Sequence, residues 1–264
     1  MKQKVNVKII QETPDYLVIH KPAGIVVHPP FLPYGEETVV GLVKKQYPEI
    51  QRVGDDPALR PGVVHRLDQE VSGVMIIART QSGFDWIKTE FKEHRVVKKY
   101  IGLVYGRVAR VEGDITFPLK KRNARIVATP KKGKGKEAKA KEAVTHFEVL
   151  APYQHYTLLS LIPKTGRTHQ LRVHCQNFGH SIVGDTRYCH PQYKNRKAFR
   201  KFVITDRIFL HASYISFKNL DSVKVEYSVP LPSELQAFLD TLSSKLEARN
   251  SKFETNLNDL NSNV

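Results

Sequence analysis

The chain has 264 residues, of which 41% are hydrophobic, enough to bury a substantial core in one large domain or two small ones. Its two cysteines exclude a disulfide scaffold, and no apolar run approaches the roughly 20 residues that cross a bilayer. Forty-two basic and 26 acidic residues give a net charge of +16, which favours a polyanionic partner, nucleic acid before a membrane.

In the first half of the chain, apolar spacing predicts both strands and helices. Thr38 suits the start of a helix that ends before Pro48, and Phe84, Ile87 and Phe91 form a helical core stripe. The expected elements are strands over 16–19 and 25–27, a helix over 38–47, a strand over 74–78, a helix over 80–94 and a strand over 99–105.

The second half is richer in strands. We expect strands over 143–150 and 156–162, a helix over 167–178 capped by Gly179, strands over 209–217 and 223–229, and a last helix from about Ser233. Strands outnumber helices without regular alternation, which favours an α+β fold with a mixed, largely antiparallel sheet flanked by helices. One domain over 1–248 with a disordered tail over 249–264 is the simplest organisation.

The basic residues concentrate in two runs. Residues 120–141 hold ten Lys or Arg and one acid, and residues 194–201 hold five more and no acid. Such runs are typical of RNA or DNA contacts, although a solvated, solubilising surface is the alternative. The part over 131–141, which contains two glycines, is expected to be a mobile loop. The N-terminus leads into no secretory signal, so we expect a cytoplasmic protein.

Asp68 is an acid in a short polar break between the apolar runs 62–64 and 74–78, with His65 and Arg66 beside it. A carboxylate between two sheet-forming runs is held in a fixed pose, as a catalytic acid requires. The alternative is a turn aspartate that bonds its own backbone.

Two further residues are candidates for chemistry. Arg172 lies on the flank of a helical stripe formed by Leu171, Cys175 and Phe178, where a guanidinium can clamp a carboxylate bidentately and lower its pKa. Alternatively, its stem covers apolar surface. Tyr100, at a strand start, suits stacking on a flipped base, or it is an ordinary strand aromatic.

These segments belong to an ordered set that runs from about residue 15 to 230. The set comprises Lys-Pro-Ala-Gly (21–24) with Val-His-Pro (27–29), His-Arg-Leu-Asp (65–68) with Ser-Gly (72–73), Lys-Tyr (99–100) with Val104 and Gly106, the stretch 165–174, Gly-Asp (184–185) with Tyr188, and Leu-His-Ala (210–212). It resembles the RluA-type RNA pseudouridine synthases. The resemblance implies a pseudouridine-synthase-like fold and an isomerase that converts specific uridines of ribosomal or transfer RNA.

The resemblance also implies residue roles. Asp68 matches the catalytic nucleophile, Arg66 the residue that helps to displace the target nucleotide, Tyr100 the tyrosine that packs against the uracil, and Arg172 the partner of the aspartate. The remaining residues expected to support RNA binding are His65, Lys99, Arg167, His169 and Gln170. Neither a cofactor nor a metal is expected, and a monomer without an obligate protein partner is the default.

The sequence departs from the family pattern at two positions. Val71 stands where threonine is usual, and Cys189 where glycine usually follows the tyrosine. Because neither is a position inferred for the nucleophile, the stacking tyrosine or the ion pair, we expect activity to survive both. Too few residues precede Tyr16 for the S4-like RNA-binding domain common in this family, so a stand-alone catalytic domain is expected.

Two other classes of protein compete with this interpretation. A metal hydrolase is suggested by six His and Cys residues between 169 and 190, but His169 and His174 are five apart and no H-E-x-x-H motif is present. A non-catalytic RNA-binding protein would account for the charge, but not for Asp68 with a matched Arg172.

Overall fold

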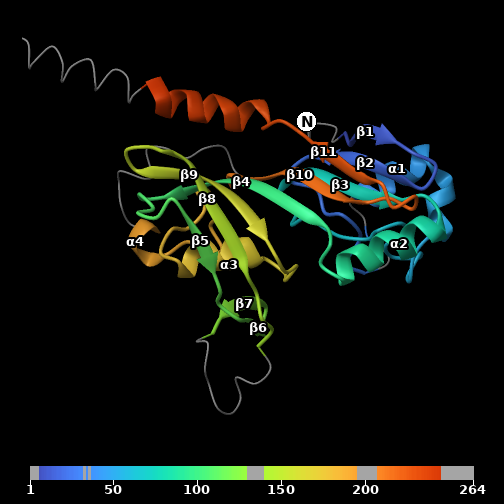
Figure 1. Ribbon diagram of the computed structural model, residues 1–264, viewed down its shortest axis with the longest axis horizontal. Coiled ribbons are helices and arrows are strands. Elements are labelled where there is room, and N and C mark those ends of the chain that lie inside the picture. The colour runs from blue at the N-terminus through green and yellow to red at the C-terminus, as the bar shows by residue number, and fades with distance from the viewer. Residues whose placement is uncertain (1–5, 32–33, 35–36, 130–139, 195–206, 245–264) are drawn as a thin grey trace, which may run out of the picture.

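The computed structural model describes residues 6–31, 34, 37–129, 140–194 and 207–244. Nine strands form one sheet in the order β1-β2-β3-β10-β4-β9-β8-β5, with β11 beside β10, and β6 and β7 form a separate hairpin (Figure 1). The strands are β1 (Lys8–Glu12), β2 (Tyr16–Lys21), β3 (Ser72–Ala78), β4 (Val97–Tyr105), β5 (Glu112–Ile115), β6 (Leu119–Arg122), β7 (Arg125–Ala128), β8 (Thr145–Pro152), β9 (Tyr156–Pro163), β10 (Leu210–Lys218) and β11 (Lys224–Ser228).

The helices cover the sheet in two groups. They are α1 (Val39–Gln46), the 3-10 helix η1 (Pro48–Arg52), α2 (Gln81–Lys92), α3 (Gln170–Asn177) and α4 (Pro191–Lys194), and residues 233–244 are also helical. In Figure 1, α1 and α2 lie beside β1, β2 and β3, whereas α3 and α4 lie beside β5, β8 and β9. No helix of the described part is long and apolar enough to span a membrane.

The expected α+β class with a mixed, largely antiparallel sheet is confirmed. Among the described strands, β3 and β10 form the one parallel pair, and the other pairs are antiparallel. Strands β3 and β9, which flank the central pair β10 and β4, are buried at every residue, and this explains their nearly continuous apolar sequences.

Threonine side chains cap the starts of α1 and α2, as was expected for Thr38. The Thr38 hydroxyl accepts a hydrogen bond from the Gly41 N–H, and the Thr80 hydroxyl accepts one from the Gly83 N–H. Each bond satisfies a backbone donor that the first turn of a helix leaves unpaired. The sequence therefore placed both helices to within a few residues.

Several expected elements differ from those observed. Residues 25–27 are not a strand, because the Val26 and Val27 carbonyls accept hydrogen bonds from the first residues of α1 instead. The helix expected from residue 167 begins only at Gln170, since His169 has left-handed backbone angles, φ 52° and ψ 22°. Strands β1, β5, β6 and β7 were not predicted. Most of the expected mobile loop over 131–141 lies outside the described residues, as do most of the basic run 194–201 and the whole tail 249–264.

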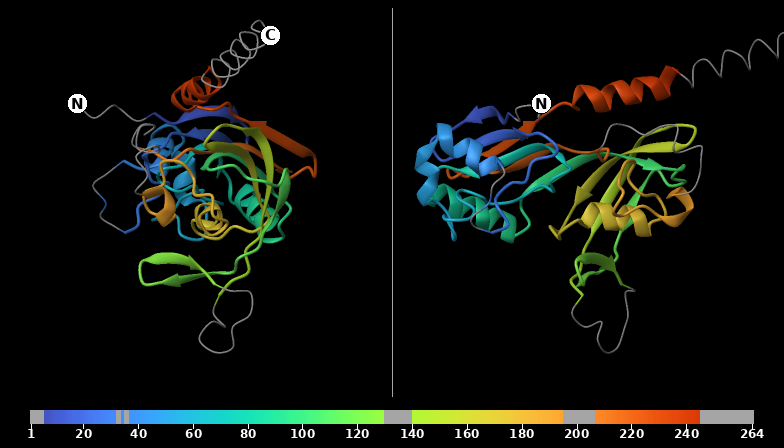
Figure 2. Two further views of the ribbon diagram at one scale, coloured as in Figure 1. Left: turned by 90° about the vertical axis from the view of Figure 1, so that its left-hand side faces the viewer. Right: turned by 180° about the vertical axis from the view of Figure 1, so that it is seen from behind.

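The two halves of the sheet meet where β10 lies between β3 and β4. At this crossing Gly73 has φ +138°, and a Cβ there would lie within 2.5 Å of three Ala212 atoms. Only glycine therefore permits this close approach. The β6–β7 hairpin projects away from the sheet on the side of α3 (Figure 2).

Candidate active site

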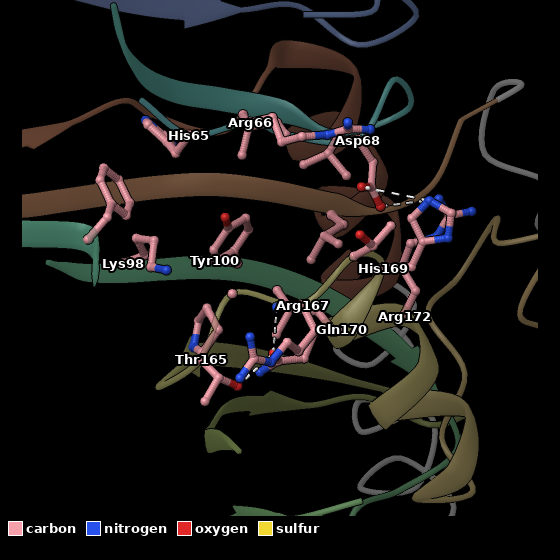
Figure 3. A pocket seen from close by; sticks show the side chains of 18 of the residues that line it. His65, Arg66, Asp68, Lys98, Tyr100, Thr165, Arg167, His169, Gln170 and Arg172 are labelled. Atoms are coloured by element: carbon pink, nitrogen blue, oxygen red, sulfur yellow. Dashed lines mark hydrogen bonds and ion pairs between the residues drawn. The ribbon is translucent and has the colours of Figure 1, made fainter. Parts of the chain in front are cut away.

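A pocket of about 560 Å³ lies at the junction of the two halves. Its walls come from the loop before β3, the end of α2, the start of β4 and the segment that leads into α3. Figure 3 shows Asp68, His169 and Arg172 at one end, Tyr100 in the middle, and His65 and Lys98 at the other end.

Asp68 is held in the loop before β3 and retains 17% of its side-chain exposure. Its Oδ2 lies 3.3 Å from Arg172 Nη1, and its Oδ1 lies 3.9 Å from His169 Nε2. The carboxylate bonds no backbone group of the described residues, so the turn-aspartate alternative does not describe its side chain. An acid with two basic neighbours therefore faces the pocket.

Arg172, only 2% exposed, is held by three acids at once. Its bidentate partner is Asp185, at 2.7 and 3.0 Å, whereas Nη1 contacts Asp68 and Glu70 singly, at 3.3 and 3.2 Å. The expected pair with Asp68 is thus present, but the bidentate clamp is made to Asp185. Burial alone would lower the pKa of Arg172, but hydrogen bonds and charges from the three acids raise it.

Lys21, which is fully buried, braces the loop that follows Asp68. Its ammonium donates to the Pro22, Gln69 and Val71 carbonyls at 2.9, 3.1 and 2.8 Å. Burial lowers the pKa of Lys21 to about 7, and the Asp68 charge opposes that shift. Sequence reasoning assigned Lys21 no role, since a lysine beside proline and glycine looked like part of a turn.

Strand alternation on β4 decides which residues reach the pocket. Lys98 and Tyr100 line it, whereas the expected RNA-binding Lys99 is exposed on the other face, with Nζ 5.6 Å from the Tyr214 ring centre. Lys98, which was missed, has Nζ 5.5 Å from the Phe91 ring centre, and burial lowers its pKa. Burial first and the Asp68 charge second raise the pKa of Tyr100.

Two expected RNA-binding residues bond within the protein. The buried Gln170 side chain accepts from the Thr165 hydroxyl and the Arg167 N–H, and donates to the Val144 carbonyl and the Thr145 hydroxyl. All its polar groups are therefore used in tying the start of α3 to β8. His65 Nε2 likewise accepts from the Ile76 N–H, and burial lowers the pKa of His65 to about 3, so its imidazole is neutral.

Arg66 and Arg167, in contrast, remain available for a ligand. Both are exposed and line the pocket. Arg66 forms no hydrogen bond or ion pair with any described residue, and Arg167 donates to the Glu142 carbonyl at 3.1 Å. Guanidinium groups in this setting suit phosphate or base contacts.

The histidines and cysteines between 169 and 190 do not converge. His174 bonds the Thr145 hydroxyl and the Phe117 carbonyl, and Cys175 lies in the core. Within the described ranges, no group of three His, Cys, Asp or Glu could hold a metal ion. Of the two departures from the family pattern, Val71 is a core residue, and Cys189 is partly buried beside Tyr188.

Comparisons with known proteins agree on one family. The family profile described as RNA pseudouridylate synthase matches residues 15–177. Ribosomal large subunit pseudouridine synthase D of Zymomonas mobilis is 30% identical over 243 residues, which cover 91% of this chain and 74% of the relative. An uncharacterized RNA pseudouridine synthase of Chloroflexus aurantiacus is 36% identical over 231 residues, with coverages of 86% and 66%.

A solved structure supports the same assignment. Human RNA Pseudouridylate Synthase Domain Containing 1 has a TM-score of 0.68 and 25% identity, with 92% of this chain and 95% of that chain covered. Sequence profile, relatives and fold therefore point the same way. The chain belongs to the RNA pseudouridylate synthase family, with relatives of the RluA type, and is an isomerase that forms pseudouridine in RNA.

Proposed function

We propose that this enzyme isomerises a flipped-out uridine of ribosomal or transfer RNA with ionised Asp68 as its nucleophile. The observation that carries the proposal is the ion pair between Asp68 and the buried Arg172 at the end of the pocket. The names of relatives such as ribosomal large subunit pseudouridine synthase D favour large-subunit ribosomal RNA as the first substrate to test. The protein acts as a cytoplasmic monomer in this proposal.

The chemistry explains why a fixed carboxylate is needed. The C–N glycosidic bond breaks, the uracil turns, and the ring is rejoined to the sugar through C5, so the net reaction needs no redox or energy cofactor. A carboxylate can attack C1′, as in retaining glycosidases, or C6 of the uracil. Both routes require the ionised form, which the positive charge of Arg172 stabilises.

Tyr100 supplies a surface for the base in this proposal. Its side chain lies in the middle of the pocket, between Asp68 and Lys98 (Figure 3). A tyrosine of ordinary pKa is already protonated at neutral pH, and burial moves the pKa of Tyr100 further upward, so the residue stacks as a neutral phenol. In this proposal the Tyr100 hydroxyl relays the proton lost from C5 to water, while N1 of the uracil, released from the sugar, gains a proton.

Base flipping costs a few kcal/mol, which contacts to the displaced strand must offset. Arg66 lines the pocket mouth without an internal partner, so it is free to occupy the space that the base leaves or to hold a phosphate. A second groove shares residues 166–168 with the pocket and is lined by basic residues of the β6–β7 hairpin and its surroundings: Lys120, Lys121, Arg122, Lys141 and Arg167. Its charge suits the phosphates of the flanking RNA.

The test uses purified full-length protein and an unmodified transcript of large-subunit ribosomal RNA. Wild-type protein is expected to form pseudouridine at defined positions, whereas Asp68→Asn forms none and still binds the transcript with similar affinity. Product formation by Asp68→Asn would exclude the nucleophile assignment. If the wild-type protein binds RNA but modifies no uridine in ribosomal or transfer RNA, these RNAs are not its substrates.

A further inference from the structure

His169 occupies an unusual backbone position beside the proposed nucleophile. Its left-handed angles, φ 52° and ψ 22°, are uncommon for a residue other than glycine, although histidine adopts them more often than most side chains do. It begins α3 without giving that helix a side-chain cap. Such strain persists when the surroundings fix the residue, and it often accompanies a functional position.

Each nitrogen of the His169 ring faces a different partner. Nδ1 lies 2.8 Å from the Tyr188 hydroxyl, and Nε2 faces Asp68 Oδ1 at 3.9 Å. The second distance is too long for a hydrogen bond, but catalytic hydrogen bonds are often long before substrate binds and then shorten. Arg172 holds the other oxygen, Oδ2, of the same carboxylate.

The partners of the Tyr188 hydroxyl favour one of the two neutral forms of the His169 ring. Its oxygen accepts a hydrogen bond from the Ile126 N–H of β7 at 3.4 Å. Its own hydrogen then has one acceptor within the described structure, the His169 Nδ1 lone pair. A neutral imidazole that accepts at Nδ1 carries its proton on Nε2.

Tyr188 is itself rigidly held. It is 1% exposed, its N–H donates to Asp185 Oδ1 at 2.9 Å, and the Arg125 and Arg172 guanidinium groups each lie 5.2 Å from its ring centre. The backbone N–H of Tyr188 is thus bonded to the same Asp185 that clamps Arg172. Asp185 therefore connects the two groups that face the Asp68 oxygens, Arg172 directly and His169 through Tyr188.

We propose that Tyr188 is a positioning residue that keeps the His169 proton on Nε2, so that His169 presents an N–H to the Asp68 carboxylate. The significance of this contact rests on the proposed role of Asp68 as nucleophile. The two oxygens of the carboxylate then have separate donors, a neutral imidazole for Oδ1 and a guanidinium for Oδ2. The opposite tautomer would direct a lone pair at a carboxylate, which is repulsive.

The charges around His169 are consistent with a neutral ring. Burial is the largest cause of the lowered pKa of His169; Arg172 and Arg187 lower it further, whereas Asp68 and Glu70 oppose the shift. The segment after α3 also packs against His169, and its polar group there is the Tyr188 hydroxyl. The ring therefore acts as a hydrogen-bond donor without a net charge.

Tautomer measurement tests the inference without any RNA. In full-length protein labelled with ¹⁵N-histidine, long-range nitrogen–proton spectra distinguish the two neutral tautomers, and His169→Gln identifies the signals. We expect the Nε2–H form in the wild type and a shift toward a mixture in Tyr188→Phe. Tyr47→Phe, which loses a surface hydroxyl bond to Glu12, is the matched control and is expected to change nothing. A wild-type Nδ1–H form, or an unchanged spectrum in Tyr188→Phe, would overturn the inference.

Substitution of His169 separates its chemistry from its backbone role. The Gln amide can place a donor near the position of Nε2, whereas the shorter Asn reaches only the position of Nδ1 but tolerates left-handed angles better. In single-turnover reactions on the unmodified large-subunit transcript, we expect His169→Asn to lose about tenfold more rate than His169→Gln. Equal losses, or a faster Asn variant, would show a purely structural residue. An inactive wild type would instead refute the proposed substrate and leave the tautomer result standing.

Discussion

Arg172 has two different kinds of partner. Asp185 engages it through two nitrogens and is fully buried, so this pair fixes the guanidinium in place. The remaining nitrogen, Nη1, is then directed at Asp68 and Glu70. A guanidinium suits this arrangement because its planar fork fixes the directions of its five donors, whereas an ammonium has a single nitrogen.

The first prediction follows from that geometry. Arg172→Lys keeps the charge but loses the fork, so we expect single-turnover pseudouridine formation to fall about 100-fold, with RNA affinity changed far less. Glu70→Gln removes an acid that shares Nη1 but is 45% exposed, and it is expected to change the rate little. Equal losses of rate and affinity in Arg172→Lys would contradict the ion-pair role.

His211 provides a second prediction, on stability. It is fully buried, its Nδ1 lies 2.8 Å from the Ser72 hydroxyl, and burial lowers its pKa from 6.5 to about 4. Since the unfolded chain binds this proton more tightly, acid favours unfolding. The stabilisation is complete above pH 6.5 and is lost as the pH falls toward 4, by about 2 kcal/mol at pH 5.

Chemical denaturation between pH 7 and 5 measures this effect. The wild-type free energy of unfolding is expected to fall with acid, and His211→Asn should have a shallower slope than the wild type. His94→Asn alters an exposed histidine at φ 58°, where asparagine is well tolerated, and should keep the wild-type slope. The same slope in all three proteins would show that His211 does not titrate in this range.

At the scale of single elements, the spacing of residues identified several pocket residues but did not show which way they face or which residues they contact. The flank position of Arg172 and the apolar runs around Asp68 both identified pocket residues. Period-two alternation on β4 could have separated Lys98 from Lys99, but the inward face becomes known only once Tyr100 is placed. Asp185 as the clamp of Arg172 was beyond prediction, because nothing local to either residue indicates that contact.

The third prediction concerns the crossing of β3 and β10. Gly73→Ala adds a Cβ within 2.5 Å of Ala212 backbone atoms at a positive φ, so we expect a strongly lowered melting temperature or no folding. Gly24→Ala has a positive φ of 91° but no atom within 4 Å of the added Cβ, so it isolates the backbone cost. Thermal unfolding of both variants measures the difference, and equal shifts would show that the close approach is not limiting.

At the scale of the whole molecule, the fold class was predictable but the strand order was not. Strand content and irregular alternation indicated an α+β fold with a mixed sheet. The insertion of β10 between β3 and β4 joins residues more than 100 positions apart, such as Ala212 with Gly73 and Tyr100. Pairing between strands that are distant in sequence depends on how their apolar faces pack together, and no local sequence pattern predicts it.

The distribution of charge leads to the fourth prediction. Removing Lys120, Lys121 and Arg122 together from the β6–β7 hairpin should weaken RNA binding and reduce its salt dependence, because fewer phosphate counterions are released. Replacing Lys8, Lys44 and Lys45, which are exposed on β1 and α1, removes the same charge and should have a smaller effect. Titrations with the ribosomal RNA transcript at several salt concentrations measure both slopes, and equal changes would leave no special role for the groove.

The most direct test of the central claim is pseudouridine mapping of total RNA from cells that lack this protein, complemented with wild type or with Asp68→Asn. The proposed mechanism predicts that one or a few sites disappear, that wild type restores them, and that Asp68→Asn expressed at the same level restores none. Restoration by Asp68→Asn would contradict the mechanism, because the isomerisation would then proceed without the carboxylate.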